Sequence, residues 1–231
     1  AYVEKTGRLL KTEAVSVEDY IEPFRRRTAD GSEVVHITIS AEMSACYQNA
    51  CLAAREVPGV YPVDSRNLST GMGLVVIEAA KRAQAGESGA DIQKAMEELT
   101  PRVEASFVID RLDYLYKGGR CSALAALGAN LLHLKPCIEV RNGKMAVCKK
   151  YRGSFEKCIR QYVKERLDGR EDIAPELAFI THAAADANVV AAAKEEAAQY
   201  GSFETVEETQ AGCTVSCHCG PNTLGILFVR K

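Results

Sequence analysis

The sequence predicts an α/β protein of two domains, with a mostly parallel sheet flanked by helices in the first and a mixed α/β arrangement in the second. Strand-like and helix-like segments alternate up to Pro101, which is typical of a parallel sheet. After Pro101 the pattern changes to an Asn-Gly hairpin signal and further strands. A chain of 231 residues is long enough to bury two cores. We therefore expect domains over residues 1–101 and 102–231.

Composition and charge exclude several classes of protein. The chain is 47% hydrophobic and 26% charged, as is usual for a globular protein. Its net charge of −2 gives no reason to expect nucleic acid as a partner. Apolar runs stay below the ~20 residues that span a bilayer and no signal peptide is evident, so we expect a cytoplasmic protein without stable membrane insertion. Nine cysteines without C-x-x-C pairs indicate reduced thiols.

The elements of the first half follow from capping signals and hydrophobic periodicity. Ser16 and Asp19 have the spacing of a capping box, which predicts a first helix after Thr12. The β-branched run 34–39 predicts a strand that enters a helix near Ser44. We expect the remaining elements to be a strand over 60–65, a helix from Ser69 to about Ala85 and a helix from Ser88 to Pro101.

The junction at Ser44 is a candidate anion site. A helix that follows a strand directly leaves free backbone N–H groups and the positive end of its dipole facing outward, where a carboxylate or phosphate can bind. Taken alone, Ser44 is more simply explained as a plain N-cap. Gly71-Met72-Gly73 lacks the third glycine of a dinucleotide fingerprint, and no phosphate-binding P-loop motif is present. The sequence therefore gives no support for nucleotide binding.

The second half contains two basic segments and one long apolar segment. Lys117-Gly118-Gly119-Arg120 predicts a flexible basic loop, and residues 123–134 predict a helix enclosed by core or by a hydrophobic ligand. Asn142-Gly143 predicts a hairpin between strands 137–140 and 145–148. A second basic cluster of Lys149, Lys150 and Arg152 precedes a helix capped by Ser154, and strand 177–181, helix 186–200 and strand 203–206 follow.

The last segment, residues 215–229, has a polar turn around His218 that runs into a buried strand. Gly220 and Pro221 fix a turn whose backbone can approach a ligand closely, although a histidine at the edge of the core explains the same pattern. A metal site at Cys213, Cys217, His218 and Cys219 is not expected, because neighbouring residues of an extended strand point to opposite faces.

Six motifs occur in an order and spacing that resembles the DegV family. The resemblance implies a two-domain α/β protein that binds a long-chain fatty acid between its domains and needs no cofactor. Some members of the family that this chain resembles serve as the fatty-acid-binding subunit of a bacterial fatty acid kinase. The catalytic residues of that kinase belong to a separate chain. The motifs are Lys11-Thr12 to Ser16, Ile39 to Ser44, Val63-Asp64-Ser65, Lys117 to Ser122, Tyr151-Arg152-Gly153 and His218-Cys219-Gly220-Pro221.

The resemblance also implies roles for individual residues. It assigns the fatty-acid carboxylate to Thr12, Ser44 and His218, which can all donate hydrogen bonds. Supporting roles fall on Ser40, Gly119, Arg120 and Gly220, and docking of the kinase falls on Lys149, Lys150 and Arg152.

The sequence departs from the family pattern in three places. The family normally opens with a strand carrying an Asp-Ser motif and this sequence begins after it, so we expect the first sheet to lack that strand. Glu13-Ala14-Val15 replaces the usual Ser-Gln-Pro, and Cys219 stands where a small hydroxyl residue is common. These departures bear on the identity of the ligand more than on the fold.

Two alternatives to fatty-acid binding are compatible with the same residues. A serine hydrolase or acyltransferase would use Ser44 as nucleophile and His218 as base. Ser44 lacks a Gly-x-Ser-x-Gly elbow, however, and no acid that orients His218 is evident. A further alternative is that the chain is a truncated folding remnant that binds no ligand. A fatty-acid carrier without catalytic residues remains the leading hypothesis.

Overall fold

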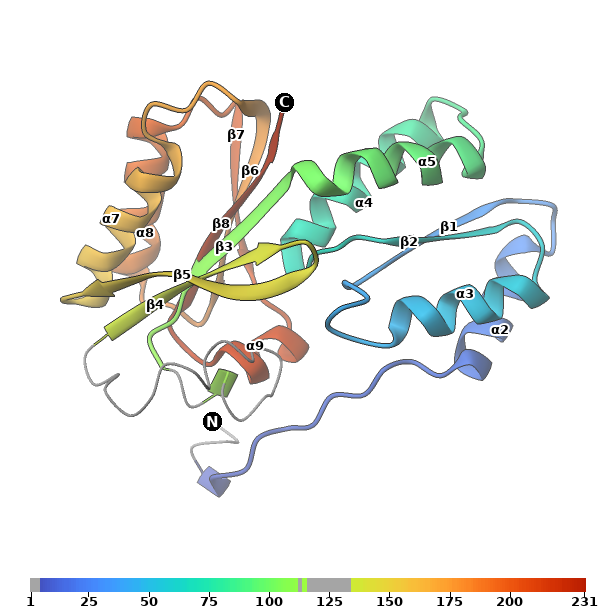
Figure 1. Ribbon diagram of the computed structural model, residues 1–231, viewed down its shortest axis with the longest axis horizontal. Coiled ribbons are helices and arrows are strands. Elements are labelled where there is room, and N and C mark those ends of the chain that lie inside the picture. Colours follow the sequence, from blue (N-terminus) through green and yellow to red (C-terminus); the bar gives the residue numbers. More distant parts are fainter. Residues whose placement is uncertain (1–4, 112–113, 116–133) are drawn as a thin grey trace. The chain divides into compact units, whose positions relative to one another are not determined.

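The structure is a computed structural model that describes residues 5–111, 114–115 and 134–231 (Figure 1). It divides into two compact units. The two-stranded unit comprises Glu13–Val103 and the hairpin turn Asn142–Lys144. The six-stranded unit comprises the residues up to Thr12, Glu104–Arg141 and Met145–Lys231.

The two-stranded unit is built on a parallel pair of strands, as predicted. Strand β1 (Val34–Thr38) pairs in parallel with β2 (Val60–Asp64), with Val34 opposite Val60. One pair of helices covers one face of this sheet and a second pair covers the other (Figure 1). These helices are α2 (Val17–Thr28), α3 (Cys46–Glu56), α4 (Ser69–Gln84) and α5 (Gly89–Leu99), followed by the 3-10 turn η1 (Thr100–Arg102).

Capping explains where two of these helices begin. The backbone N–H of Asp19 donates to Ser16 Oγ, and that of Asp91 donates to Ser88 Oγ, both at 3.2 Å. Each serine satisfies one of the N–H groups that a helix leaves unpaired at its start. The helix starts predicted from Ser16 and Ser88 are therefore confirmed.

The six-stranded unit is a mixed sheet with the strand order β5-β4-β3-β8-β6-β7. Strand β6 runs parallel to β7 and antiparallel to β8, and β3 runs antiparallel to β4. The strands are β3 (Val103–Val108), β4 (Leu134–Arg141), β5 (Lys144–Arg152), β6 (Ile173–Ala183), β7 (Thr205–Gln210) and β8 (Thr223–Arg230). This unit also contains helices α7 (Phe155–Leu167), α8 (Ala187–Tyr200) and α9 (Cys213–Cys219). The mixed α/β arrangement predicted for the second half is confirmed.

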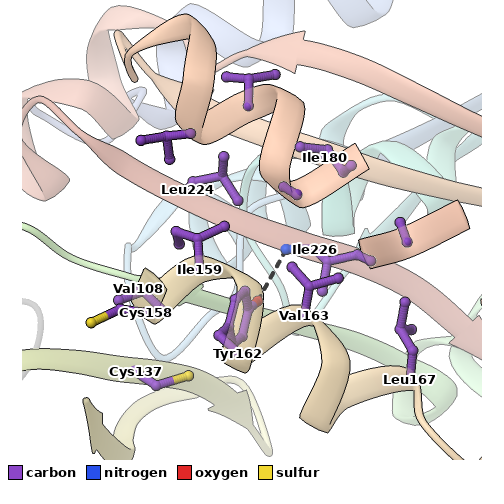
Figure 2. Packing of buried hydrophobic residues seen from close by; sticks show 14 of the residues in the cluster. Val108, Cys137, Cys158, Ile159, Tyr162, Val163, Leu167, Ile180, Leu224 and Ile226 are labelled. Atoms are coloured by element: carbon purple, nitrogen blue, oxygen red, sulfur yellow. Dashed lines mark hydrogen bonds between the residues drawn. The ribbon is translucent and has the colours of Figure 1, made fainter. Parts of the chain in front are cut away.

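The main core of this unit lies between the sheet and helices α7 and α8, which pack side by side (Figures 1 and 2). Tyr162 of α7 is fully buried there, and its hydroxyl links two strands. It donates to the Ser106 carbonyl of β3 at 2.6 Å. It also accepts from the Ile226 N–H of β8 at 3.0 Å, the bond drawn in Figure 2. Ser106 Oγ lies 2.8 Å from the same oxygen. Burial raises the pKa of Tyr162, so the hydroxyl keeps its proton.

The predicted hairpin forms between β4 and β5. Asn142 and Gly143 both have positive φ, 51° and 80°, which is the conformation of a two-residue type I′ turn. Such a turn pairs Arg141 with Lys144 and fixes every residue pair beyond it. Residues 137 and 148 are therefore directly opposite each other on the two strands.

One sequence prediction needs correction, and two others concern residues outside the described part of the chain. Residues 215–219, predicted as part of a strand, belong to helix α9, and β8 begins only at Thr223. The predicted helix over 123–134 and the loop that carries Gly119 and Arg120 lie outside the described residues, except for Leu134, which begins β4.

None of the helices in the described part of the chain has both the length and the apolar character that crossing a bilayer requires.

Candidate functional site

Helix α9 holds His218 next to rigid structure. The helix ends because Gly220 takes φ 78° and ψ 172°, a conformation that only glycine adopts readily, and donates its N–H to the Ser216 carbonyl at 2.8 Å. A Cβ at Gly220 would lie 2.7 Å from a ring carbon of Tyr114. Since 217–219 are helical, the strand argument against a metal site at these residues is wrong. Among the described residues, however, no three His, Cys, Asp or Glu side chains are grouped to hold a metal ion.

We predict that Gly220→Ala lowers the free energy of unfolding by about 1–3 kcal/mol, because alanine is strained at this φ and ψ and its methyl group meets Tyr114. Urea denaturation measures the change. Gly212→Ala is the matched control, since Gly212 begins the same helix at φ −62° and a Cβ there meets nothing within 4 Å. Equal stability losses in the two variants would contradict the role given to Gly220.

Thr12 and His218 form the centre of the candidate site. Thr12 Oγ1 lies 2.8 Å from His218 Nε2, although the two residues are 206 positions apart in the sequence. Both side chains are half-buried, and both belong to the six-stranded unit. When Nε2 carries the proton it donates to the threonine oxygen, and the threonine O–H is then available to donate to a further acceptor. The pair can thus present an oriented hydroxyl donor to an anion.

Ser44 lies one residue before the N-cap of α3, which is Ala45. The sequence predicted that the helix begins near Ser44 and offered Ser44 as its N-cap or first turn, but the helix begins two residues later, at Cys46. The N–H groups of Met43 and Ser44 both donate to the Ser40 carbonyl, at 2.9 and 3.2 Å, and form a separate turn ahead of the helix.

The hydroxyl of Ser44 already has hydrogen-bond partners. Ser44 Oγ accepts from the Cys46 N–H at 3.3 Å and donates to Cys46 Sγ at 3.2 Å. Burial raises the pKa of the Cys46 thiol, but hydrogen bonds from Ser44, from the backbone and from Tyr20 outweigh it and leave that pKa lowered. Ser44 belongs to the two-stranded unit, whereas Thr12 and His218 belong to the six-stranded unit.

Ser40 has a structural task in the two-stranded unit. It is fully buried, and its hydroxyl donates to the Gly143 carbonyl at 2.8 Å. Asp64, which the sequence placed in a family motif without an individual role, accepts from the N–H groups of Ala41 and Arg66 at 3.1 and 2.8 Å. It thereby ties the turn after β1 to the end of β2. A carboxylate at the end of a predicted strand was the available signal.

An apolar cluster lies beside α9 in the six-stranded unit. Its buried members come from β3, β4, α9 and the segment that follows β3, and three further members are only partly buried. Because side chains alternate along a strand, this cluster occupies the face of the sheet opposite to α7 and α8. The buried members are Phe107, Ile109, Leu115, Ile138 and Cys219, and the partly buried ones are Met145, Val147 and Val215.

The basic residues at the end of β5 are exposed. Lys149, Lys150 and Arg152 all face solvent, and Lys149 Nζ forms an ion pair with Glu165 at 2.7 Å. Ser154 caps the following helix α7 by accepting from the Lys157 N–H at 3.4 Å, as predicted. The end of β5 therefore presents positive charge next to a well-defined helix start.

The described chain is a two-unit α/β protein with a hydroxyl–imidazole pair beside an apolar cluster. A family model described as uncharacterised protein, DegV family, matches residues 1–231. The chain belongs to the DegV family.

Individual relatives agree with this assignment. A DegV domain-containing protein of Clostridium acetobutylicum is 30% identical over 224 residues, which cover 95% of this chain and 78% of the relative. A protein of Thermotoga maritima named fatty acid-binding protein is 29% identical and is matched over 96% of this chain and 78% of its own length. A Thermus thermophilus structure, described as fatty acid binding of a DegV family protein, is similar with a TM-score of 0.87 and 28% identity. The similarity covers 100% of this chain and 82% of that one.

Proposed function

We propose that this protein binds a long-chain fatty acid and holds its carboxylate at Thr12 and His218. The observation that carries the proposal is the 2.8 Å contact between Thr12 Oγ1 and His218 Nε2, next to a cluster of apolar side chains. The Thermotoga and Thermus relatives, described as binding fatty acids, support the same ligand class. No catalytic role is assigned to the chain itself.

Hydrogen bonding sets the orientation of the carboxylate. Nε2–H of His218 donates to Thr12, and the threonine O–H donates in turn to a carboxylate oxygen. His218 thereby holds the hydroxyl in the donating direction. A hydrogen bond to a charged group contributes about 1.5–3 kcal/mol, enough to fix which end of the ligand lies at the pair.

Burial of the acyl chain supplies most of the affinity. We place the chain along the partly buried members of the apolar cluster, Met145, Val147 and Val215, because Val215 lies one helical turn before His218 on α9. At about 0.8 kcal/mol per buried methylene, fifteen methylenes contribute on the order of 12 kcal/mol. Affinity therefore depends mainly on the chain, and the polar pair determines placement.

Ser44 is proposed as a further donor to the carboxylate. Its hydroxyl donates to Cys46 Sγ, which is a weak acceptor. Replacing this hydrogen bond with one to a carboxylate oxygen therefore costs little free energy. The same bond does not favour the hydrolase alternative, because the single proton of the hydroxyl points to sulfur. Turnover of an activated ester that disappears in Ser44→Ala would favour the hydrolase instead.

We also propose that the bound carboxylate is presented to a separate kinase chain, with Lys149, Lys150 and Arg152 as the docking surface. Three exposed cations at the end of one strand steer an acidic partner more effectively than they bind a buried lipid. Glu165 pairs with Lys149, which leaves Lys150 and Arg152 as the stronger contributors.

We expect Arg152→Ala to slow phosphorylation of the bound fatty acid by the kinase on the order of 3- to 10-fold, because loss of a rim charge lowers the association rate. Lipid content should stay at the wild-type level. The exposed Arg26 of α2 provides the control, and Arg26→Ala should leave both quantities unchanged. Loss of lipid from the Arg152 variant would place this arginine at the ligand rather than at the partner.

Mass spectrometry of the ligand released from natively purified protein tests the proposed function. We expect about one long-chain fatty acid per chain, since a ligand bound mainly by burial of many methylenes survives purification. A delipidated sample that fails to take up palmitate, together with an absence of copurified fatty acid, would overturn the proposal.

A further inference from the structure

Two cysteines face each other across the β4–β5 hairpin. The type I′ turn at Asn142-Gly143 places Cys137 directly opposite Cys148. Cys148 Sγ lies 3.4 Å from the Cys137 carbonyl oxygen, and one nitrogen of Arg166 lies within hydrogen-bonding distance of both sulfur atoms. Cys137 packs in the core beneath α7 (Figure 2), so both side chains lie on that face of the hairpin.

The two thiols differ in their access to solvent. Cys137 is fully buried, whereas Cys148 is exposed. Among the strands of the described residues, β5 is the outermost of its sheet and pairs with β4 alone. A small reagent can therefore reach Cys148 directly, whereas the Cys137 side chain is closed to solvent.

Arg166 of α7 brings a positive charge to the pair. Its Nη2 lies 3.0 Å from Cys148 Sγ and 3.7 Å from Cys137 Sγ. The same nitrogen lies 3.1 Å from Glu139 Oε2, which holds the guanidinium in place. Opposite charges at this distance stabilise a thiolate.

The acidities of the thiols agree with this geometry. The hydrogen bond from Cys137 and the charge of Arg166 outweigh burial and the carboxylate of Glu139, and lower the pKa of Cys148 to about 7. The hydrogen bond with Cys148 and burial raise the pKa of Cys137. At neutral pH the proton of the pair therefore resides on Cys137, and Cys148 has substantial thiolate character.

We propose that Cys148 and Cys137 form a peroxide-reactive dithiol, in which Cys148 is the attacking thiolate and Cys137 the resolving thiol. The oxidant is a hydroperoxide. The pair lies on the face of the sheet opposite to the apolar cluster proposed for the acyl chain, and it adds a redox modification to this protein.

The reaction balances in two steps. The Cys148 thiolate attacks the hydroperoxide and the O–O bond breaks. The leaving oxygen takes up a proton and departs as water or an alcohol, and Cys148 becomes a sulfenic acid. Cys137 then loses its proton and attacks the Cys148 sulfur, the S–O bond breaks, and water leaves as the disulfide forms. The two thiols supply the two electrons that reduce the hydroperoxide.

The site is tested by treating the full chain with equimolar hydrogen peroxide, blocking the remaining thiols and mapping the peptides by mass spectrometry. We expect a Cys137–Cys148 disulfide in the wild type. Cys137→Ala should accumulate a dimedone-reactive sulfenic acid at Cys148, and Cys148→Ser should leave Cys137 reduced. Oxidation that joins other cysteines first, or that proceeds equally well in Cys148→Ser, would overturn the proposal.

Alkylation by iodoacetamide tests the role of Arg166 without requiring oxidation. Cys148 should react about threefold faster at pH 7 than an ordinary thiol, since its larger thiolate fraction outweighs its weaker nucleophilicity. The midpoint of its rate–pH profile should lie near 7 and move toward 8.5 in Arg166→Met. Cys213, also exposed, serves as the internal reference and should keep its rate in that variant. A Cys148 profile with its midpoint near 8.5 in the wild type would contradict the proposal.

Discussion

Replacing Tyr162 by phenylalanine should lower the free energy of unfolding by about 2–4 kcal/mol. The hydroxyl of Tyr162 bonds to the Ser106 carbonyl and the Ile226 N–H within the core, on strands β3 and β8. Phenylalanine keeps the ring but leaves these backbone groups without that partner in a site closed to water. Urea denaturation of the delipidated protein measures the loss.

Tyr151→Phe is the control for this prediction. Tyr151 packs edge-to-face against Tyr162, with the ring centroids 6.4 Å apart. Its hydroxyl donates to Glu165 at 2.7 Å, and the Glu165 carboxylate can turn to solvent when that bond is lost. We expect a cost of about 1 kcal/mol or less. A Tyr162 variant no less stable than the Tyr151 variant would mean that the hydroxyl does not hold the two strands together.

Loss of the hydroxyl–imidazole pair should have the largest effect on the ligand. Thr12→Val removes the hydroxyl with almost no change in shape, and we expect palmitate to bind 10- to 100-fold more weakly, or about 1.5–3 kcal/mol. His218→Gln should have a similar effect, since it alters the partner that orients the same hydroxyl. Titration of delipidated protein with palmitate measures both constants.

The two variants together show whether the residues act as a pair. Because the residues are in direct contact, the double variant should lose little more than either single variant. Additive losses would instead mean that each side chain binds the ligand separately. If the melting temperature falls sharply in His218→Gln while palmitate binding stays unchanged, the role of this histidine is structural.

Local signals predicted much of this fold. Ser16, Ser88 and Ser154 each cap a helix because their hydroxyls satisfy the first free N–H groups, and this chemistry depends only on nearby residues. Asn142-Gly143 forms the predicted hairpin because both residues accept positive φ. Features set by a few neighbouring residues can therefore be predicted from the sequence.

The errors occurred where longer-range contacts decide the structure. Helix α9 has only seven residues, too few to show a helical period, and it ends where Gly220 packs closely against Tyr114. The turn before α3 depends on two N–H groups that share the Ser40 carbonyl, which displaces Ser44 from the helix. Sequence pattern alone does not contain either contact.

Only part of the candidate site could be predicted from the sequence. No local pattern joins Thr12 to His218 across 206 positions, and only the family resemblance selected both. The roles of Asp64 and Tyr162 were missed, since a carboxylate after a strand and a tyrosine within an apolar helix face have many structural explanations. Their hydrogen bonds become visible only in the folded chain.

Carbon-13 NMR of palmitate labelled at its carboxyl carbon tests the central claim most directly, because it reports where the carboxylate lies. We predict a bound resonance separate from that of free palmitate, and a change in its chemical shift in both Thr12→Val and His218→Gln. Hydrogen bonds to the charged form should also lower the pKa of the bound carboxyl relative to the free acid. A bound resonance that is identical in the wild type and in both variants would contradict the account, since the carboxylate would then lie away from Thr12 and His218.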